Sequence, residues 1–155
     1  MSLQTEVELL RRVTLFAHID TTKLKLLAFT SERLTYGEGQ ALFHEGDLGD
    51  GAYLILDGEV DVLRNSDSGL ILVNHLVKHS LVGEMSILCD VPRTANVVAT
   101  MPVDALKIRK ETFFQLLKEV PQLALEIMRE LARRLNHTND ELVAARAALK
   151  ARSGA

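Results

Sequence analysis

The chain has 155 residues, enough for one domain and too few to leave much room for a second. Its composition, 47% hydrophobic and 25% charged, is typical of a globular protein, and with few aromatic residues and no Trp the core must consist mainly of Leu, Val and Ile. A formal net charge of -3 argues against attraction of a polyanion by the molecule as a whole. The single Cys89 excludes an internal disulfide framework, and no apolar run reaches the length of a membrane span, so we expect a cytoplasmic protein.

The N-terminal segment, residues 1–30, is predicted to be helical. Leu3, Val7 and Leu10 recur at helical spacing, and a second apolar cluster follows residues 20–22. Because Asp and Thr are residue types that cap helix N-termini, a second helix is predicted to begin there.

The central segment, residues 31–109, is predicted to form short strands separated by glycine turns. Asp57-Gly58 is a strong signal for a hairpin turn between two β-rich runs. Short strands at this even spacing indicate an antiparallel sandwich or barrel. The runs richest in strand-forming residues are 52–56, 60–63, 70–77, 95–99 and 103–108.

The C-terminal segment, residues 110–150, is predicted to return to helix. Pro121 fits the first turn of a new helix. No Gly or Pro occurs between residues 122 and 150, so one long helix of about 43 Å is expected at about 1.5 Å per residue. Together the segments predict one α+β domain over residues 1–155, an antiparallel β-sandwich flanked by N-terminal helices and a long C-terminal helix.

The segment 81–97 combines groups that suit a phosphate joined to a ribose. Gly83 ends a predicted strand and allows a ligand to approach the backbone closely, and a short apolar helix over 84–88 presents its first amides to an anion. Arg93, after a turn and at the opening of the next predicted strand, offers a fork of donors for phosphate oxygens. Glu84 can accept hydrogen bonds from sugar hydroxyls.

Simpler interpretations exist for each of these residues. Arg93 taken alone could be a surface turn arginine, and Glu84 could be a first-turn carboxylate that stabilises its helix by roughly 0.3–1 kcal/mol. Their joint spacing favours a binding site. A metal site is not expected, because the histidines show neither a His-x-His pair nor an HExxH motif. These histidines are His18, His44, His75, His79 and His137.

Residues 82–95 resemble the phosphate-binding cassette of cyclic nucleotide-binding domains, a family that includes protein kinase A regulatory subunits, the catabolite activator protein and cyclic-nucleotide-gated channels. The cassette has Gly-Glu, a short apolar helix, and Arg followed by a small residue and Ala, as found here at 83–84, 85–88 and 93–95; Val82 replaces the usual Phe. Upstream, residues 43–60 resemble the glycine-turn strands of the same family. The resemblance extends over roughly residues 16–139.

The resemblance implies a jelly-roll sandwich and a regulatory, non-enzymatic domain that binds cyclic AMP or cyclic GMP without a further cofactor. It places Glu84 on the ribose 2′-hydroxyl, Arg93 on the cyclic phosphate and Thr94 on the phosphate or a guanine. Two alternatives stay open: a non-binding relative that serves as a dimerisation scaffold, and a metal enzyme of the cupin type, for which clustered histidines are lacking. The implied ligand-binding residues are Gly83, Glu84, Met85, Ser86, Arg93, Thr94, Ala95, Thr138 and Asn139.

The predicted long helix carries a possible dimer seam. Its members step by 4, 3, 4, 3 and 4 residues, the spacing that pairs helices, and predict a homodimer; the alternative is a helix packed on its own sandwich. They are Leu131, Leu135, Thr138, Leu142, Ala145 and Leu149. The resemblance to the catabolite activator protein implies that Thr138 contacts the base of the nucleotide. It implies that Asn139 contacts the same base from the partner chain.

Two further expectations concern the same helix. Arg129, Arg133 and Arg134 are expected to form a solvated face. The chain ends at Ala155 with no helix-turn-helix after the long helix, so DNA binding is not expected to carry over from the catabolite activator protein.

Overall fold

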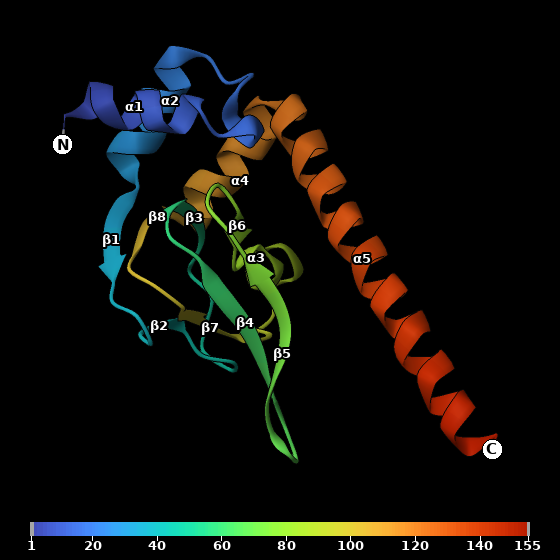
Figure 1. The fold of residues 1–155 in the computed structure, drawn as a ribbon. Coiled ribbons are helices and arrows are strands. Elements are labelled where there is room, and N and C mark those ends of the chain that lie inside the picture. Colours follow the sequence, from blue (N-terminus) through green and yellow to red (C-terminus); the bar gives the residue numbers. More distant parts are fainter. Residues whose placement is uncertain (1, 155) are drawn as a thin grey trace.

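Two four-stranded antiparallel sheets form the centre of the molecule in the computed structural model, which describes residues 2–154 (Figure 1). This arrangement confirms the predicted antiparallel sandwich. The first sheet contains, in spatial order, β1 (Glu32–Tyr36), β8 (Val103–Arg109), β3 (Gly51–Asp57) and β6 (Leu81–Val82). The second contains β2 (Ala41–Phe43), β7 (Asn96–Ala99), β4 (Val60–Ser66) and β5 (Gly69–Leu76).

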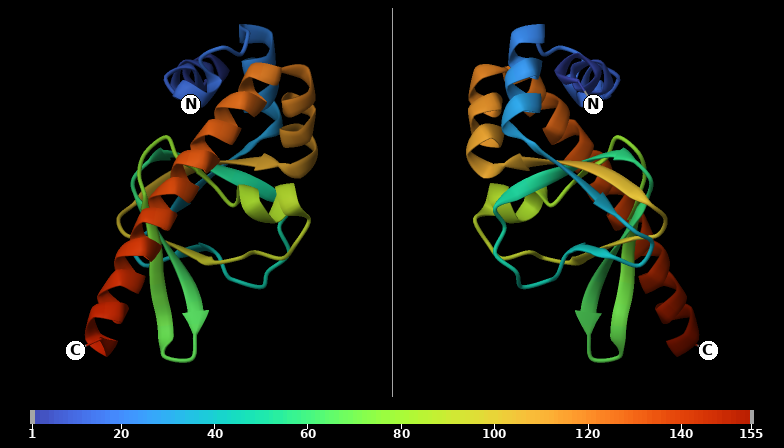
Figure 2. Two further views of the ribbon diagram at one scale, coloured as in Figure 1. Left: turned by 90° about the vertical axis from the view of Figure 1, so that its right-hand side faces the viewer. Right: turned by 90° about the vertical axis from the view of Figure 1, so that its left-hand side faces the viewer.

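Helices cover one end and one side of the sandwich, as Figures 1 and 2 show. Asp20 accepts a hydrogen bond from the Lys23 amide at 2.9 Å and begins the second helix, as its residue type predicts. Pro121 occupies the first turn of the last helix. The helices are α1 (Leu3–Arg11), the 3-10 turn η1 (Thr14–Phe16), α2 (Thr21–Thr30), α3 (Glu84–Cys89), α4 (Lys110–Glu119) and α5 (Pro121–Ser153).

Strand β3 is apolar along nearly its whole length and shows no alternation of apolar and polar residues. Leu54 and Leu56 belong to a core shared with the helices, whereas Tyr53 and Ile55 belong to the core between the sheets. Because side chains alternate along a strand and both faces of β3 are covered, every residue from Gly51 to Leu56 is buried.

Two strands were not singled out by the sequence pattern, namely β1 and β2. Strand β2 has three residues, too few to show a period. Strand β6, with two residues, is the strand that Gly83 was expected to end. Strand β1 is polar, and its Arg33 forms an ion pair with Asp104 of β8. The expectation that Arg93 opens the next strand is wrong. Strand β7 begins at Asn96, and Arg93 lies in the loop before it.

Helix α5 changes character along its length. Leu123 and Ile127 are buried, and Leu131 packs against the helical core. Every described residue from 135 to 154 is exposed, including Leu135 at 61% and Leu149 at 67%. Within this single chain the distal half of α5 therefore does not pack on its own sandwich. Among residues 2–154, no helix has the length and apolar character needed to cross a bilayer.

Candidate ligand-binding site

A cavity of about 370 Å³ lies between the β4–β5 hairpin, helix α3 and helix α5. It collects nearly all of the residues expected to bind a ligand, although they come from separate segments of the chain. The expected residues that line it are Gly83, Glu84, Met85, Ser86, Arg93, Thr94, Ala95 and Thr138. Asn139 does not line the cavity in the described part of the chain and is exposed on α5.

The backbone around α3 requires glycine at position 83. Gly83 has a φ of 81° as the N-cap of α3, a conformation that side chains disfavour. A Cβ atom at this position would also lie 2.6 Å from Nη1 of Arg93. The glycine therefore allows the short helix to begin directly against the arginine.

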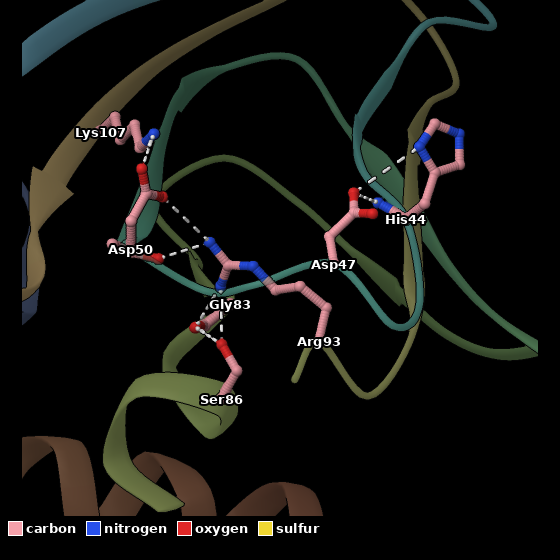
Figure 3. Close-up of polar contacts among 8 residues, drawn as sticks. His44, Asp47, Asp50, Gly83, Ser86, Arg93 and Lys107 are labelled. Carbon is pink, nitrogen blue, oxygen red and sulfur yellow. Dashed lines mark hydrogen bonds and ion pairs between the residues drawn. The ribbon is translucent and has the colours of Figure 1, made fainter. Parts of the chain in front are cut away.

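The loop that carries Arg93 is held by the upstream segment that resembles the same family. The Arg93 amide donates to the carbonyl of Asp47 at 2.8 Å, and the Gly46 amide donates to the carbonyl of Arg93 at 2.9 Å. The Asp47 side chain in turn accepts from the His44 amide at 3.0 Å. These contacts join two motifs that lie some 40 residues apart in sequence; Figure 3 shows the contact between Asp47 and His44.

The guanidinium of Arg93 is buried, with only 3% of the residue exposed. It donates to the carbonyls of Gly83 and Gly51, both at 2.8 Å, and to Oγ of Ser86 at 3.0 Å (Figure 3). Its Cζ also lies 4.2 Å from the centre of the Phe43 ring. Burial lowers the pKa of Arg93, but a guanidinium stays charged in proteins.

The charge of Arg93 is incompletely compensated. Its nearest carboxylate in an ion pair is Asp50 at 4.0 Å, and that carboxylate is itself bound to Lys107 at 3.0 Å. Nε of Arg93 is buried and has no hydrogen-bond partner among the described residues. A buried donor without an acceptor is costly, so this corner of the cavity favours an anion with several acceptor oxygens.

Glu84 is paired with an arginine that the sequence analysis misjudged. Glu84 is only 5% exposed, and Nη1 of Arg134 donates to its Oε1 at 3.1 Å. Nη2 of Arg134 donates to the carbonyl of Leu81 at 2.8 Å. Burial raises the pKa of Glu84, and the Arg134 charge opposes that shift.

The expectation that Arg134 belongs to a solvated face is therefore wrong, because this part of α5 lies over α3 and turns the side chain inward, leaving it 18% exposed. Arg129 and Arg133 remain exposed, as expected, and form ion pairs within the helix.

The remaining wall of the cavity comes from strands that the sequence analysis did not assign to the site. Phe43 lies in the upstream motif and could have been found there. The strand residues carry no local signal, because alternation alone does not reveal which face of a strand lines a cavity. They include Val62 and Arg64 of β4 and Val73, Asn74 and Leu76 of β5.

Comparisons with known families identify the family to which the chain belongs. The family of cyclic nucleotide-binding domains matches residues 33–120. The Thermus thermophilus cyclic AMP receptor protein is 33% identical over 112 residues, which are 72% of this chain and 52% of that protein. A cAMP-dependent protein kinase regulatory subunit from Eremothecium gossypii is 39% identical over 97 residues, which are 63% of this chain and 20% of that protein.

Solved structures share the fold. The catabolite activator protein of Thermus thermophilus superimposes with a TM-score of 0.72 at 30% identity, over 84% of this chain and 62% of that one. The regulatory subunit of a cAMP-independent protein kinase A from Trypanosoma brucei has a TM-score of 0.76 at 22% identity, which shows the fold alone, over 90% of this chain and 51% of that one. The chain thus spans about half to three fifths of the bacterial regulators it matches.

Proposed function

The chain belongs to the cyclic nucleotide-binding domain family, and from that premise we propose that it binds cyclic AMP or cyclic GMP in the cavity beside α3 and acts as a cytoplasmic regulatory domain rather than an enzyme. One observation carries the proposal. Arg93 and Glu84 line the same cavity, both are buried, and Nε of the Arg93 guanidinium has no hydrogen-bond partner among the described residues. A cyclic phosphate supplies acceptor oxygens, and a ribose 2′-hydroxyl supplies a donor for the carboxylate.

The dimensions of the site support a ligand of nucleotide size. Its volume of about 370 Å³ falls within the range of small-molecule pockets, roughly 300–1,000 Å³. With the phosphate at Arg93 and the ribose at Glu84, the base is left between the β4–β5 wall and Thr138 of α5. Thr138 and Thr94 carry hydroxyls, which can donate or accept and so serve either purine.

The ion pair between Glu84 and Arg134 supports a route from ligand to helix. It links the start of α3 to the middle of α5. A ribose hydroxyl on Glu84 changes the hydrogen bonding of that carboxylate, and hence the contact that positions α5. Such a ligand shifts the equilibrium between two positions of α5. The size of the shift is set by the difference in its affinity for the two positions.

Calorimetric titration with cyclic AMP and cyclic GMP tests the proposal directly. We expect saturable binding of at least one of them at one site per chain. Thermal unfolding with the same nucleotides and a panel of divalent metals provides an independent readout, since a ligand that binds only the folded state raises the Tm. A rise with metals alone would favour the cupin-type alternative, and no response to any ligand would favour a non-binding scaffold.

The non-binding scaffold remains the second candidate because the fold does not guarantee the ligand. A structure with the same fold is described as the regulatory subunit of a cAMP-independent kinase. The lysophospholipase nte1 of Aspergillus oryzae also contains a matching segment, which covers 78% of this chain and 7% of that protein, so the domain occurs within enzymes too. In this chain, the presence of both Glu84 and Arg93 in one cavity supports binding.

We further propose a parallel homodimer through α5. Leu135, Leu142 and Leu149 lie at seam spacing and are 61%, 45% and 67% exposed in the single chain. A second α5 would bury them, and apolar burial stabilises by about 25 cal/mol per Å². In this arrangement Asn139 of the second copy, exposed here, is placed to contact the base beside Thr138.

Leu135→Glu combined with Leu142→Glu should give monomers, because it places like charges across the seam, and should weaken nucleotide binding through loss of the second chain's base contact. Analytical ultracentrifugation and titration, each with and without nucleotide, measure the two effects. Asn136→Glu combined with Ala144→Glu adds the same charge off the seam and should change neither. A wild-type chain that is monomeric with ligand at tens of micromolar contradicts the dimer.

A further inference from the structure

The β4–β5 hairpin holds an imidazole between two carboxylates. Nδ1 of His75 lies 2.6 Å from Oδ1 of Asp61, and Nε2 lies 2.6 Å from Oε1 of Glu59. Asp61 is the residue directly opposite His75 in the β4–β5 register, and Glu59 lies in the turn just before β4. One side chain on β5 is thus fixed by two on the neighbouring strand and its turn.

This geometry defines the protonation state of the ring. A neutral imidazole has one N–H donor and one acceptor nitrogen, so it can donate to only one of the two carboxylates and would direct a lone pair at the other. Two short contacts to carboxylate oxygens therefore favour the imidazolium form, in which both nitrogens carry a proton. The hydrogen bond to Asp61, followed by that to Glu59, raises the pKa of His75 above its ordinary value.

The location of His75 connects it to the cavity. β5 is the edge strand of its sheet and pairs with β4 within the described chain. The neighbours of His75 in sequence, Asn74 and Leu76, both line the cavity, as does Val62 on β4. Whatever holds β5 against β4 at position 75 therefore also fixes the wall against which the base would lie.

In the part of the chain that the structure describes, Asp61 and Glu59 are the charged groups that shift the pKa of His75. The residue of β7 paired with Asp61 is Val98, and Thr100 contributes only bonds to the backbone carbonyl of Glu59. Lys78, beyond the end of β5, is not among the causes that shift the pKa of His75. The charges at this contact between β4 and β5 are therefore those of one imidazolium and two carboxylates.

We propose that His75 is a positioning residue whose protonated ring clamps β5 onto β4 and thereby makes the order of the cavity wall, and the affinity for the nucleotide, depend on pH. The affinity part of this inference rests on the proposed function; the order of the hairpin does not.

The direction of the dependence follows from the sign of the shift. Because the folded pKa is raised, the clamp is complete below the ordinary histidine pKa of about 6.5 and is lost as the pH rises through the raised value. Nucleotide affinity should therefore fall as the pH rises above the ordinary histidine pKa of about 6.5 and through the raised value. Since the ring is 41% exposed, we expect a modest change of about two- to fivefold.

Hydrogen exchange across β5 tests the clamp without any ligand. Protection factors for residues 70–76, corrected for the intrinsic pH dependence of exchange, should fall with rising pH in the wild-type chain. They should be low and independent of pH in His75→Gln. His18→Gln, which replaces an exposed histidine away from the cavity, should behave as wild type. Equal protection in wild type and His75→Gln at every pH would overturn the proposal.

Titration with cyclic nucleotide at the same pH values tests whether the protonation of His75 affects nucleotide affinity. Wild type should lose affinity as the pH rises, and Glu59→Gln combined with Asp61→Asn should remove that dependence, because amides bind a neutral ring as well as a charged one. A wild-type slope that persists in this double variant would overturn the coupling. If no cyclic nucleotide binds at any pH, the proposed function fails, while hydrogen exchange still decides whether the clamp exists.

Discussion

Arg93→Ala should weaken cyclic-nucleotide binding by about 30-fold or more, because it removes one side of a buried charge pair, a loss of about 2–5 kcal/mol. The guanidinium is the buried positive charge of the cavity corner that suits a phosphate, and its Nε is unused there. Isothermal titration measures the loss. Arg129→Ala, which removes an exposed arginine of α5, is the matched control and should leave affinity unchanged.

The structure adds an effect on stability that the sequence did not suggest. Arg93 also donates to two backbone carbonyls and to Ser86, so Arg93→Ala leaves buried acceptors without partners at about 1–3 kcal/mol each. The Tm of the ligand-free protein should therefore fall as well. Arg93→Lys separates the two effects, since it keeps the charge but cannot make the same fork of hydrogen bonds. A folded Arg93→Ala protein with unchanged affinity would refute the phosphate assignment.

Glu84→Ala should weaken binding by roughly tenfold or more, because it removes the acceptor of a hydrogen bond to a charged group, a loss of about 1.5–3 kcal/mol. The decisive measurement pairs this variant with a 2′-deoxy cyclic nucleotide. If Glu84 accepts a hydrogen bond from the 2′-hydroxyl, the deoxy ligand should lose affinity on wild type and little further on the variant. Losses that simply add would show that the carboxylate does not contact the ribose.

Because Glu84 forms an ion pair with Arg134, the same experiment needs a control for the loss of that ion pair. Replacing Glu84 leaves Arg134, whose side chain is only 18% exposed, without that carboxylate, which destabilises the fold independently of any ligand. Arg134→Ala, alone and combined with Glu84→Ala, measures how much of the loss comes from the ion pair. A loss in Glu84→Ala that vanishes in the Arg134→Ala background would assign the effect to the position of α5.

The sequence predicted long or strongly patterned elements and missed those defined by distant partners. α5 was foreseen because 33 residues without an internal Gly or Pro leave little alternative. β2 has three residues and exists because β7 supplies its hydrogen-bond partners. No local pattern can indicate a strand of that kind.

The same distinction applies to the cavity. Gly83, Glu84 and Arg93 lie within eleven consecutive residues and could be grouped by spacing. Arg134 lies 50 residues from Glu84, and helical periodicity alone does not show which side of α5 faces the cassette. Likewise, the place of Asn74 in the cavity wall depends on the register between β4 and β5, which shifts at a β-bulge between Val62 and Leu63.

The position of Arg134 along α5 gives the helix the proportions of a lever. The buried residues Leu123 and Ile127 anchor its short arm, and the exposed remainder extends for about 28 Å beyond Arg134 at about 1.5 Å per residue. A tilt of about 10° around this point would move the far end by about 5 Å, close to one helical turn. A small change of angle at this contact would thereby become a displacement that a neighbouring chain or domain can detect.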